Sequence, residues 1–167
     1  MSAIISNTLN FKGGVTTDRD KKVAEYLNNI AKLPDNFSKE LFEAKSDLSG
    51  EKLSKTILGD LATYDIANKK FSIAQIEMIG AEELIKNRLD EILDILNKTK
   101  KENNLDFIFL SAIDLEKEKV YIITDDENTK ELVKKILQID FIGNIAIKDE
   151  LIMRKQISPL LKKELEK

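Results

Sequence analysis

The feature that most constrains the fold is a long amphipathic segment that leads directly into a short apolar one. Residues 81–103 place apolar side chains at the spacing of one helix face. These side chains are Leu84, Ile85, Leu89, Ile92, Leu93 and Leu96. Residues 105–114 are almost continuously apolar, which is typical of a central strand covered on both faces. A helix followed by such a strand favours an α/β fold.

Shorter segments continue the alternation of strands and helices. A hairpin is expected from residues 64–66 and 71–79, and residues 120–124 are expected to pair with the 105–114 strand. One or two further short strands are expected in residues 145–147 and 151–153. Helices are expected over residues 18–33, 38–45, 53–58, 127–137 and 155–167. We therefore predict an α/β fold whose mixed β-sheet of about five strands is flanked by helices.

The whole chain, residues 1–167, is expected to form a single domain. No internal repeat or long linker divides it. Within this domain we expect an N-terminal helical portion, residues 1–60, and a mixed-sheet portion, residues 61–167.

The amino-acid composition excludes several kinds of chemistry. The chain contains no Cys, which excludes disulfides, thiolate nucleophiles and Cys-ligated zinc. It contains no His, which excludes Ser-His-Asp catalysis and His-built metal sites. Chemistry within the chain must therefore come from carboxylates, Lys, Arg, hydroxyl groups or backbone amides.

Charge and hydropathy exclude two classes of partner. A formal net charge of −3 and a pI of about 5.3 lack the basic excess of a dedicated duplex-DNA binder. No apolar run approaches the roughly 20 residues that a membrane-spanning helix requires. We expect a soluble cytoplasmic protein that binds neither nucleic acid nor membrane.

Positive charge is concentrated at the two ends of the chain. Residues 1–22 hold four basic and two acidic side chains, and residues 148–167 hold six basic and four acidic ones. Folding could therefore bring Lys12 and the pair Arg154–Lys155 together around an anion. Ordinary solvation of Lys-rich ends is the alternative explanation.

Two local motifs are consistent with anion binding. Lys12-Gly13-Gly14 precedes Thr16-Thr17-Asp18, so a cation and flexible backbone amides lie before a helix N-terminus, although the P-loop order is absent. Arg154 and Lys155 lie where a strand is expected to end and a helix to begin, and both side chains bind phosphate well. Either motif alone can be an ordinary cap or a solvated pair. The acidic pairs Asp125-Asp126 and Asp149-Glu150 are too small to form a closed metal site.

Three segments together resemble the C-terminal half of the family II, manganese-dependent inorganic pyrophosphatases of the DHH phosphoesterase superfamily. Residues 2–18 resemble the family's SAIISDTLLFKSPTCTD. Residues 74–79 are similar to its AQVETV strand, and residues 106–114 to its DLFLLMITD. Residues 153–159 match the end of SRKKQVVP.

The resemblance implies that this chain is the DHH-associated, substrate-binding domain and that the catalytic DHH domain is absent from it. Lys12 would be the substrate-binding lysine of the FKS motif, Arg154 would take one cationic position of SRKKQ, and Lys155 would match its second lysine. The DHH domain would hold manganese, or cobalt or magnesium, so we expect no metal ligand and no catalytic residue in this chain. The implied substrate is pyrophosphate or a related phosphorylated small molecule, hydrolysed to two phosphates by the full-length protein. The implied partner is the N-terminal DHH domain, and a homodimer of the full-length protein is an open option.

The sequence also departs from the family pattern. Asn7 replaces an Asp, Gly13-Gly14 replace Ser-Pro, and Met153 lies where a substrate-binding Arg is expected. Two alternatives therefore stay open: a stand-alone anion-binding or regulatory module without catalysis, and the equivalent domain of an exopolyphosphatase.

Overall fold

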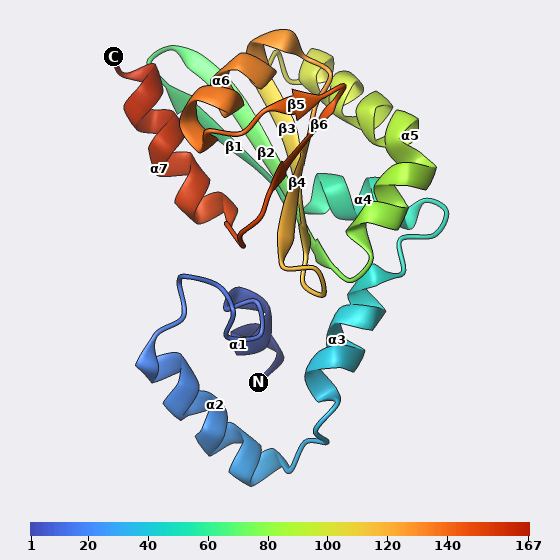
Figure 1. Cartoon of the computed structure of the whole chain (residues 1–167), viewed down its shortest axis with the longest axis vertical. Helices are drawn as coiled ribbons and strands as arrows, with labels where there is room; N and C mark the ends of the chain where they lie inside the picture. Colours follow the sequence, from blue (N-terminus) through green and yellow to red (C-terminus); the bar gives the residue numbers. More distant parts are fainter.

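The computed structural model describes residues 1–167 as a mixed six-stranded sheet with seven helices (Figure 1). The strands are β1 (Leu61–Ile66), β2 (Lys69–Met78), β3 (Phe107–Asp114), β4 (Lys119–Ile123), β5 (Phe141–Ile142) and β6 (Ile145–Lys148). The helices are α1 (Ser2–Asn7), α2 (Asp18–Ala31), α3 (Phe37–Ser46), α4 (Lys52–Gly59), α5 (Ala81–Glu102), α6 (Glu127–Leu137) and α7 (Arg154–Leu165). The predicted α/β class and the mixed sheet are confirmed.

The strand order in the sheet is β1-β2-β3-β4-β6-β5. Strands β2 and β3 run parallel, because the long helix α5 carries the chain back across the sheet between them. All other neighbouring strands pair antiparallel, including the two predicted hairpins β1–β2 and β3–β4.

The end of the sheet differs from the prediction in two ways. The predicted strand at residues 145–147 forms as β6, and it pairs with the two-residue strand β5, which is too short to give a periodic signal. Residues 151–153, in contrast, form no strand. Their apolar character has another cause, because Ile152 and Met153 are buried in the core just before α7 begins.

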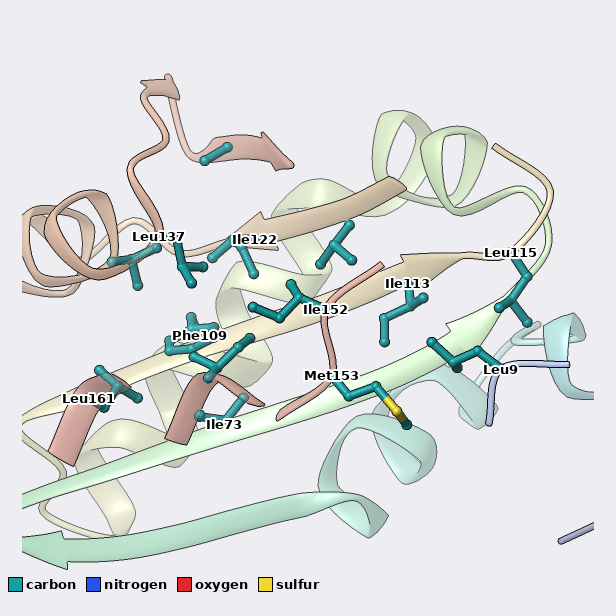
Figure 2. Close-up of a cluster of buried hydrophobic side chains, with 14 of the residues drawn as sticks. Leu9, Ile73, Phe109, Ile113, Leu115, Ile122, Leu137, Ile152, Met153 and Leu161 are labelled. Carbon is teal, nitrogen blue, oxygen red and sulfur yellow. The ribbon is translucent and has the colours of Figure 1, made fainter. Parts of the chain in front are cut away.

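The sheet has a hydrophobic core on each face, because successive side chains of β2 and β3 point to opposite sides. One core includes Ile73 and Phe109 together with side chains of α6 and α7 (Figure 2). The other includes Ala74 and Leu110 together with side chains of α4 and α5. Strand β3 is buried on both faces, which explains why residues 105–114 are almost continuously apolar.

The N-terminal helices α1, α2 and α3 lie beyond one end of the sheet (Figure 1). The chain begins with the short helix α1, and a turn with positive φ at Leu9, Asn10 and Phe11 follows it. Gly13 packs tightly there, since a Cβ atom would lie 3.0 Å from the carbonyl oxygen of Thr8. This turn fixes the position of Lys12 relative to α1.

No helix in the structure is both long enough and apolar enough to cross a membrane.

One half-buried helix cap gives the fold a testable pH dependence. Asp126 caps α6 by accepting a hydrogen bond of 2.9 Å from Thr129 N, and it pairs with Lys100. Burial by itself raises the pKa of Asp126, but the hydrogen bonds from Lys100 and Thr129 outweigh it and hold the pKa below its usual 3.8. The stabilisation is therefore complete above the carboxyl pKa of the unfolded chain and is lost as the pH falls through the lower pKa of the folded state.

We expect Asp126→Asn to lower the free energy of unfolding by about 1 kcal/mol at pH 7. Urea unfolding at pH 7 and pH 3 measures the effect. The difference between the two proteins should shrink at pH 3, and an equal difference at both values would contradict this role of the carboxylate.

Candidate functional site

A large pocket lies where β2 extends beyond its edge partner. Strand β1 pairs with β2 only as far as Leu61 opposite Ala74, so residues 75–78 pair with β3 alone and have an open side. Helix α1, helices α3 and α4, and the start of α7 surround this open side. The resulting β2-edge pocket has a volume of about 660 Å³.

Cationic side chains outnumber carboxylates around the β2-edge pocket. The lining contains five cationic residues, Lys45, Lys52, Lys55, Arg154 and Lys155, and three acidic residues, Asp47, Asp60 and Glu77. A net positive lining of this kind favours small anions.

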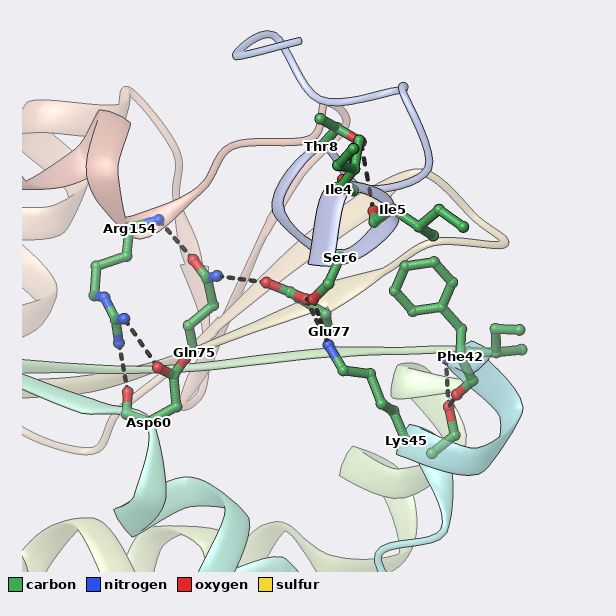
Figure 3. A network of polar contacts seen from close by, with 12 residues as sticks. Ile4, Ile5, Ser6, Thr8, Phe42, Lys45, Asp60, Gln75, Glu77 and Arg154 are labelled. Carbon is green, nitrogen blue, oxygen red and sulfur yellow. Dashed lines mark hydrogen bonds and ion pairs between the residues drawn. The ribbon is translucent and has the colours of Figure 1, made fainter. Parts of the chain in front are cut away.

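A network of hydrogen bonds connects the floor of the pocket to its walls (Figure 3). Glu77 on β2 accepts hydrogen bonds of 3.0 Å from Ser6 Oγ of α1 and from Lys45 Nζ of α3. Gln75, two residues earlier on the same face, donates a 3.0 Å hydrogen bond to Glu77. Its amide oxygen accepts a 2.6 Å hydrogen bond from the backbone N–H of Arg154. The network therefore ties α1, α3 and α7 to one strand.

Arg154 lies in the pocket wall with its guanidinium already engaged. One nitrogen lies 2.9 Å from Asp60 Oδ1, and another donates to the carbonyl oxygens of Asp60 and Ile73. The side chain is 22% exposed. Arg154 thus fastens the start of α7 to the junction of α4 and β1. Its guanidinium group could bind an anion only by giving up its contact with Asp60.

Lys155 is the cation in the pocket lining that has no carboxylate partner. The other four lysines and arginines each pair with an acidic side chain. The backbone N–H of Lys155 also has no hydrogen-bond partner within the chain, because it lies in the first turn of α7. An exposed ammonium group and an open N–H at the start of a 12-residue helix together suit a phosphate oxygen.

Lys12 does not line the β2-edge pocket. Its ammonium nitrogen lies 2.6 Å from Glu118 Oε1 at the β3–β4 turn and 3.5 Å from the carbonyl oxygen of Leu115. The loop that carries it does reach α7, since a Cβ atom on Gly14 would lie 3.4 Å from Gln156 Nε2. The N-terminal loop and the start of α7 therefore lie side by side, but the Lys12 side chain pairs with Glu118 on the β3–β4 turn.

Met153 and Asn7, the two departures from the family pattern beside the pocket, have different environments. Met153 is 6% exposed and belongs to the hydrophobic core, while it also borders the pocket. Asn7 lies at the end of α1 and lines the pocket with an amide where the family has a carboxylate.

Asp47 is one pocket carboxylate with a strongly shifted pKa. The hydrogen bond from Lys52, together with those from Ser49, lowers the pKa of Asp47 to about 2. Asp47 therefore stays ionised near neutral pH and offsets the charge of Lys52.

Several pocket residues gave no signal in the sequence. Lys45 lies on α3, whereas Lys52, Lys55 and Asp60 lie on α4 or directly after it. No spacing in the sequence relates them to Arg154. Gln75 and Glu77 are the exception, because they interrupt the apolar face that Phe71 and Ile73 begin on β2. Polar residues on a buried face are a recognisable sign of a site.

No group of three or more Asp and Glu side chains in the structure could hold a metal ion. The residues of this chain therefore do not fit a manganese centre of their own. That the chain binds no metal stays a prediction.

Residues 39–164 match the family model of the DHHA2 domain. The chain belongs to the DHHA2 domain family. This confirms the resemblance seen in the three sequence segments.

Relatives with similar sequences are manganese-dependent inorganic pyrophosphatases by name. The chain is 32% identical over 99% of its length to a Clostridium acetobutylicum protein described as a "Probable manganese-dependent inorganic pyrophosphatase", and covers 53% of that protein. It is 31% identical over its full length to the manganese-dependent inorganic pyrophosphatase of Methanothrix thermoacetophila, of which it covers 54%. A Methanococcus jannaschii crystal structure assigned to the family II inorganic pyrophosphatases superposes with a TM-score of 0.86 at 30% identity. That superposition covers 99% of this chain and 54% of the other, so the chain spans about half the length of the relatives it matches.

The bridging role of Gln75 predicts a loss of stability on substitution. Gln75→Leu would leave the N–H of Arg154 unpaired in a part of the chain where Gln75 is only 6% exposed. We expect the free energy of unfolding to fall by about 1–3 kcal/mol, measured by urea denaturation.

Ser111 provides the matched control, because it pairs with Gln75 across β2 and β3 and is also buried. Its hydroxyl has no hydrogen-bond partner, so Ser111→Ala should leave the stability unchanged or raise it. Equal destabilisation by both substitutions would show that packing, and not the hydrogen bond, matters at this position.

Proposed function

We propose that this chain is the substrate-binding C-terminal domain of a manganese-dependent inorganic pyrophosphatase, which hydrolyses pyrophosphate to two phosphates. In this proposal a preceding DHH domain holds the manganese and the chain contributes cations to the phosphates. The observation that carries the proposal is Lys155, a cation without a partner at the start of α7, in a pocket of net positive charge. Membership of the DHHA2 family and the names of the relatives support the choice of substrate.

The proposed task of the chain is to bind and orient the anion. Lys155 would bind a phosphate oxygen directly through its ammonium group and its backbone N–H. Gln75 and Asp60 would hold the start of α7 in place through Arg154. Arg154 and Lys12 remain proposed substrate contacts that would have to exchange Asp60 and Glu118, respectively, for phosphate.

No step of the reaction is assigned to a metal in this chain, because its carboxylates do not gather into a metal site. We assign charge compensation to this half, where preorganised cations offset the charge of the transferred and leaving phosphates. A cytoplasmic location and a homodimer of the full-length protein stay predictions.

A second candidate is an anion-binding module that has kept the fold without the catalysis. It is favoured by Met153, which replaces the expected Arg and packs into the core. It is also favoured by Glu118, whose carboxylate already forms an ion pair with Lys12. This module would bind pyrophosphate through Lys155 but would not support its hydrolysis.

The first test measures binding. Lys155→Ala should weaken pyrophosphate binding to the 167-residue chain at least about tenfold, because a charge-assisted hydrogen bond contributes about 1.5–3 kcal/mol. Isothermal titration with pyrophosphate measures it, and Lys163→Ala on the exposed far turn of α7 is the control. An unchanged affinity for Lys155→Ala would contradict the assigned role.

The second test measures hydrolysis in a joined polypeptide, in which the N-terminal half of the Methanococcus jannaschii protein precedes the 167 residues. The superposition fixes where the two are joined. With manganese present, we expect phosphate release from pyrophosphate by the joined polypeptide and none from the 167-residue chain alone. Binding without release in the joined polypeptide would favour the non-catalytic module, and release by the chain alone would refute both candidates.

Lys12 is tested in the same joined polypeptide. Lys12→Ala should lower the rate of phosphate release, whereas Lys163→Ala should not. Unchanged turnover and unchanged substrate affinity in Lys12→Ala would show that Lys12 has no role beyond its pair with Glu118.

A further inference from the structure

Helix α5 has a kink that its own sequence does not explain. At Arg88 the backbone leaves helical geometry, with φ −135° and ψ 25°, and the helix is divided into two segments. Pro, Gly and Ser, the residues at which sharp helix kinks commonly occur, are absent from α5. The kink coincides instead with contacts that Arg88 makes outside the helix.

Arg88 holds the loop that joins α3 to α4, residues 47–51, beside the first turns of α5 (Figure 1). Its guanidinium donates to the backbone carbonyl oxygens of Leu48 and Gly50, the latter at 2.8 Å. It also donates hydrogen bonds of 2.7 Å and 2.6 Å to the two carboxylate oxygens of Glu91 on α5. Four hydrogen bonds thus engage the planar guanidinium, a geometry that a lysine ammonium group cannot reproduce.

The 47–51 loop forms part of the wall of the β2-edge pocket. Asp47 and Leu48 of the loop line the pocket, and so do Lys52 and Lys55, which follow on α4. Arg88 itself is not among the lining residues. It can therefore influence these two lysines only through the backbone of the loop.

The loop has few other connections to the rest of the chain. Ser46, the last residue of α3, accepts a 2.8 Å hydrogen bond through its hydroxyl oxygen from the backbone N–H of Ile79, directly after β2. The Leu48 side chain is buried in the core that α5 covers. Among residues 47–51, the hydrogen bonds to a distant part of the chain all come from Arg88, because the others stay within residues 46–55. Ser46 thus anchors the α3 end of the loop, and Arg88 anchors the end that leads into α4.

We infer that Arg88 is a positioning residue for the β2-edge pocket, which holds the 47–51 loop through Leu48 and Gly50 so that Lys52 stays at the pocket wall to bind a phosphate oxygen. This inference rests on the proposed function, because it takes the pocket to bind pyrophosphate. Glu91 pairs with the charge of Arg88. We therefore assign to Arg88 the placement of Lys52 and no contact with the anion.

Pyrophosphate titration of Arg88→Lys tests the inference, because lysine keeps the positive charge but cannot form all four hydrogen bonds. We expect the dissociation constant of the 167-residue chain, measured by isothermal titration, to rise about threefold to tenfold. Arg19→Lys, at an exposed position on α2, is the matched control and should leave the dissociation constant unchanged. Circular dichroism verifies that both variants fold.

A double-mutant cycle separates positioning from general stabilisation. The same Arg88→Lys change is made in a chain that carries Lys52→Ala. Its effect on the dissociation constant should be smaller there, because the lysine through which Arg88 acts is gone. An equal fold-change in both backgrounds would overturn the inference, and so would an unchanged affinity of the Arg88→Lys chain.

A measurement without any anion separates this inference from the proposed function. Hydrogen bonds from Lys52 and Ser49 lower the pKa of Asp47 to about 2. NMR titration of the Asp47 carboxyl group in Arg88→Lys should show this pKa raised toward its usual 3.8, because a loosened loop weakens both hydrogen bonds.

The two measurements together assign each failure. A raised Asp47 pKa in Arg88→Lys, with no pyrophosphate binding even by the unsubstituted chain, would support the hold of Arg88 on the loop and contradict the proposed function. Pyrophosphate binding whose affinity does not change in Arg88→Lys, with the Asp47 pKa also unchanged, would support the proposed function and contradict this inference.

Discussion

The site depends on a difference in length between two neighbouring strands. Strand β2 continues past the last residue that β1 pairs with, and Gln75 is the first residue of the stretch that pairs with β3 alone. A buried side-chain amide at this place can form hydrogen bonds to two neighbours at once. Gln75 accepts a hydrogen bond from the backbone N–H of Arg154 and donates one to Glu77. This bridge acts together with the contacts of Arg154 to Asp60 and with the burial of Ile157 and Leu161, and it holds the N-terminus of α7 at the pocket.

Charge compensation is the second constraint on the site. The five cationic side chains of the pocket would repel one another if no anions lay near them. Each of them except Lys155 has a carboxylate within ion-pair distance. The carboxylates keep the pocket ordered, and they also compete with any ligand for the cations. Exposed ion pairs contribute little to stability, so exchange of the carboxylate for a phosphate is energetically accessible at Lys52, whose pair with Asp47 is exposed.

Much of the fold was predictable, because its main elements are long and periodic. Helix α5 and strand β3 were expected within a few residues of their bounds, since one covers a face of the sheet and the other lies between two cores. The short strand β5 has only two residues and could not be recognised by periodicity. Residues 151–153 were misinterpreted because burial beneath α7 and burial in a strand give the same apolar run.

The site was predictable only in part. The sequence motifs located the start of α7 and the loop at Gly13, and the structure does bring the two close. The direction of Lys12 could not be known, because it depends on a carboxylate, Glu118, that is 106 residues away. Lys45 and Asp60 contribute only through tertiary contacts, which no local pattern records.

The central claim is that the start of α7 binds a phosphate anion, and the most direct test is an NMR titration of the 167-residue chain with pyrophosphate. The account predicts that the backbone amide signal of Lys155 shifts most, followed by those of Arg154 and Gln75, in a saturable manner. Shifts that spread evenly over the exposed lysines, with none at Lys155, would contradict it.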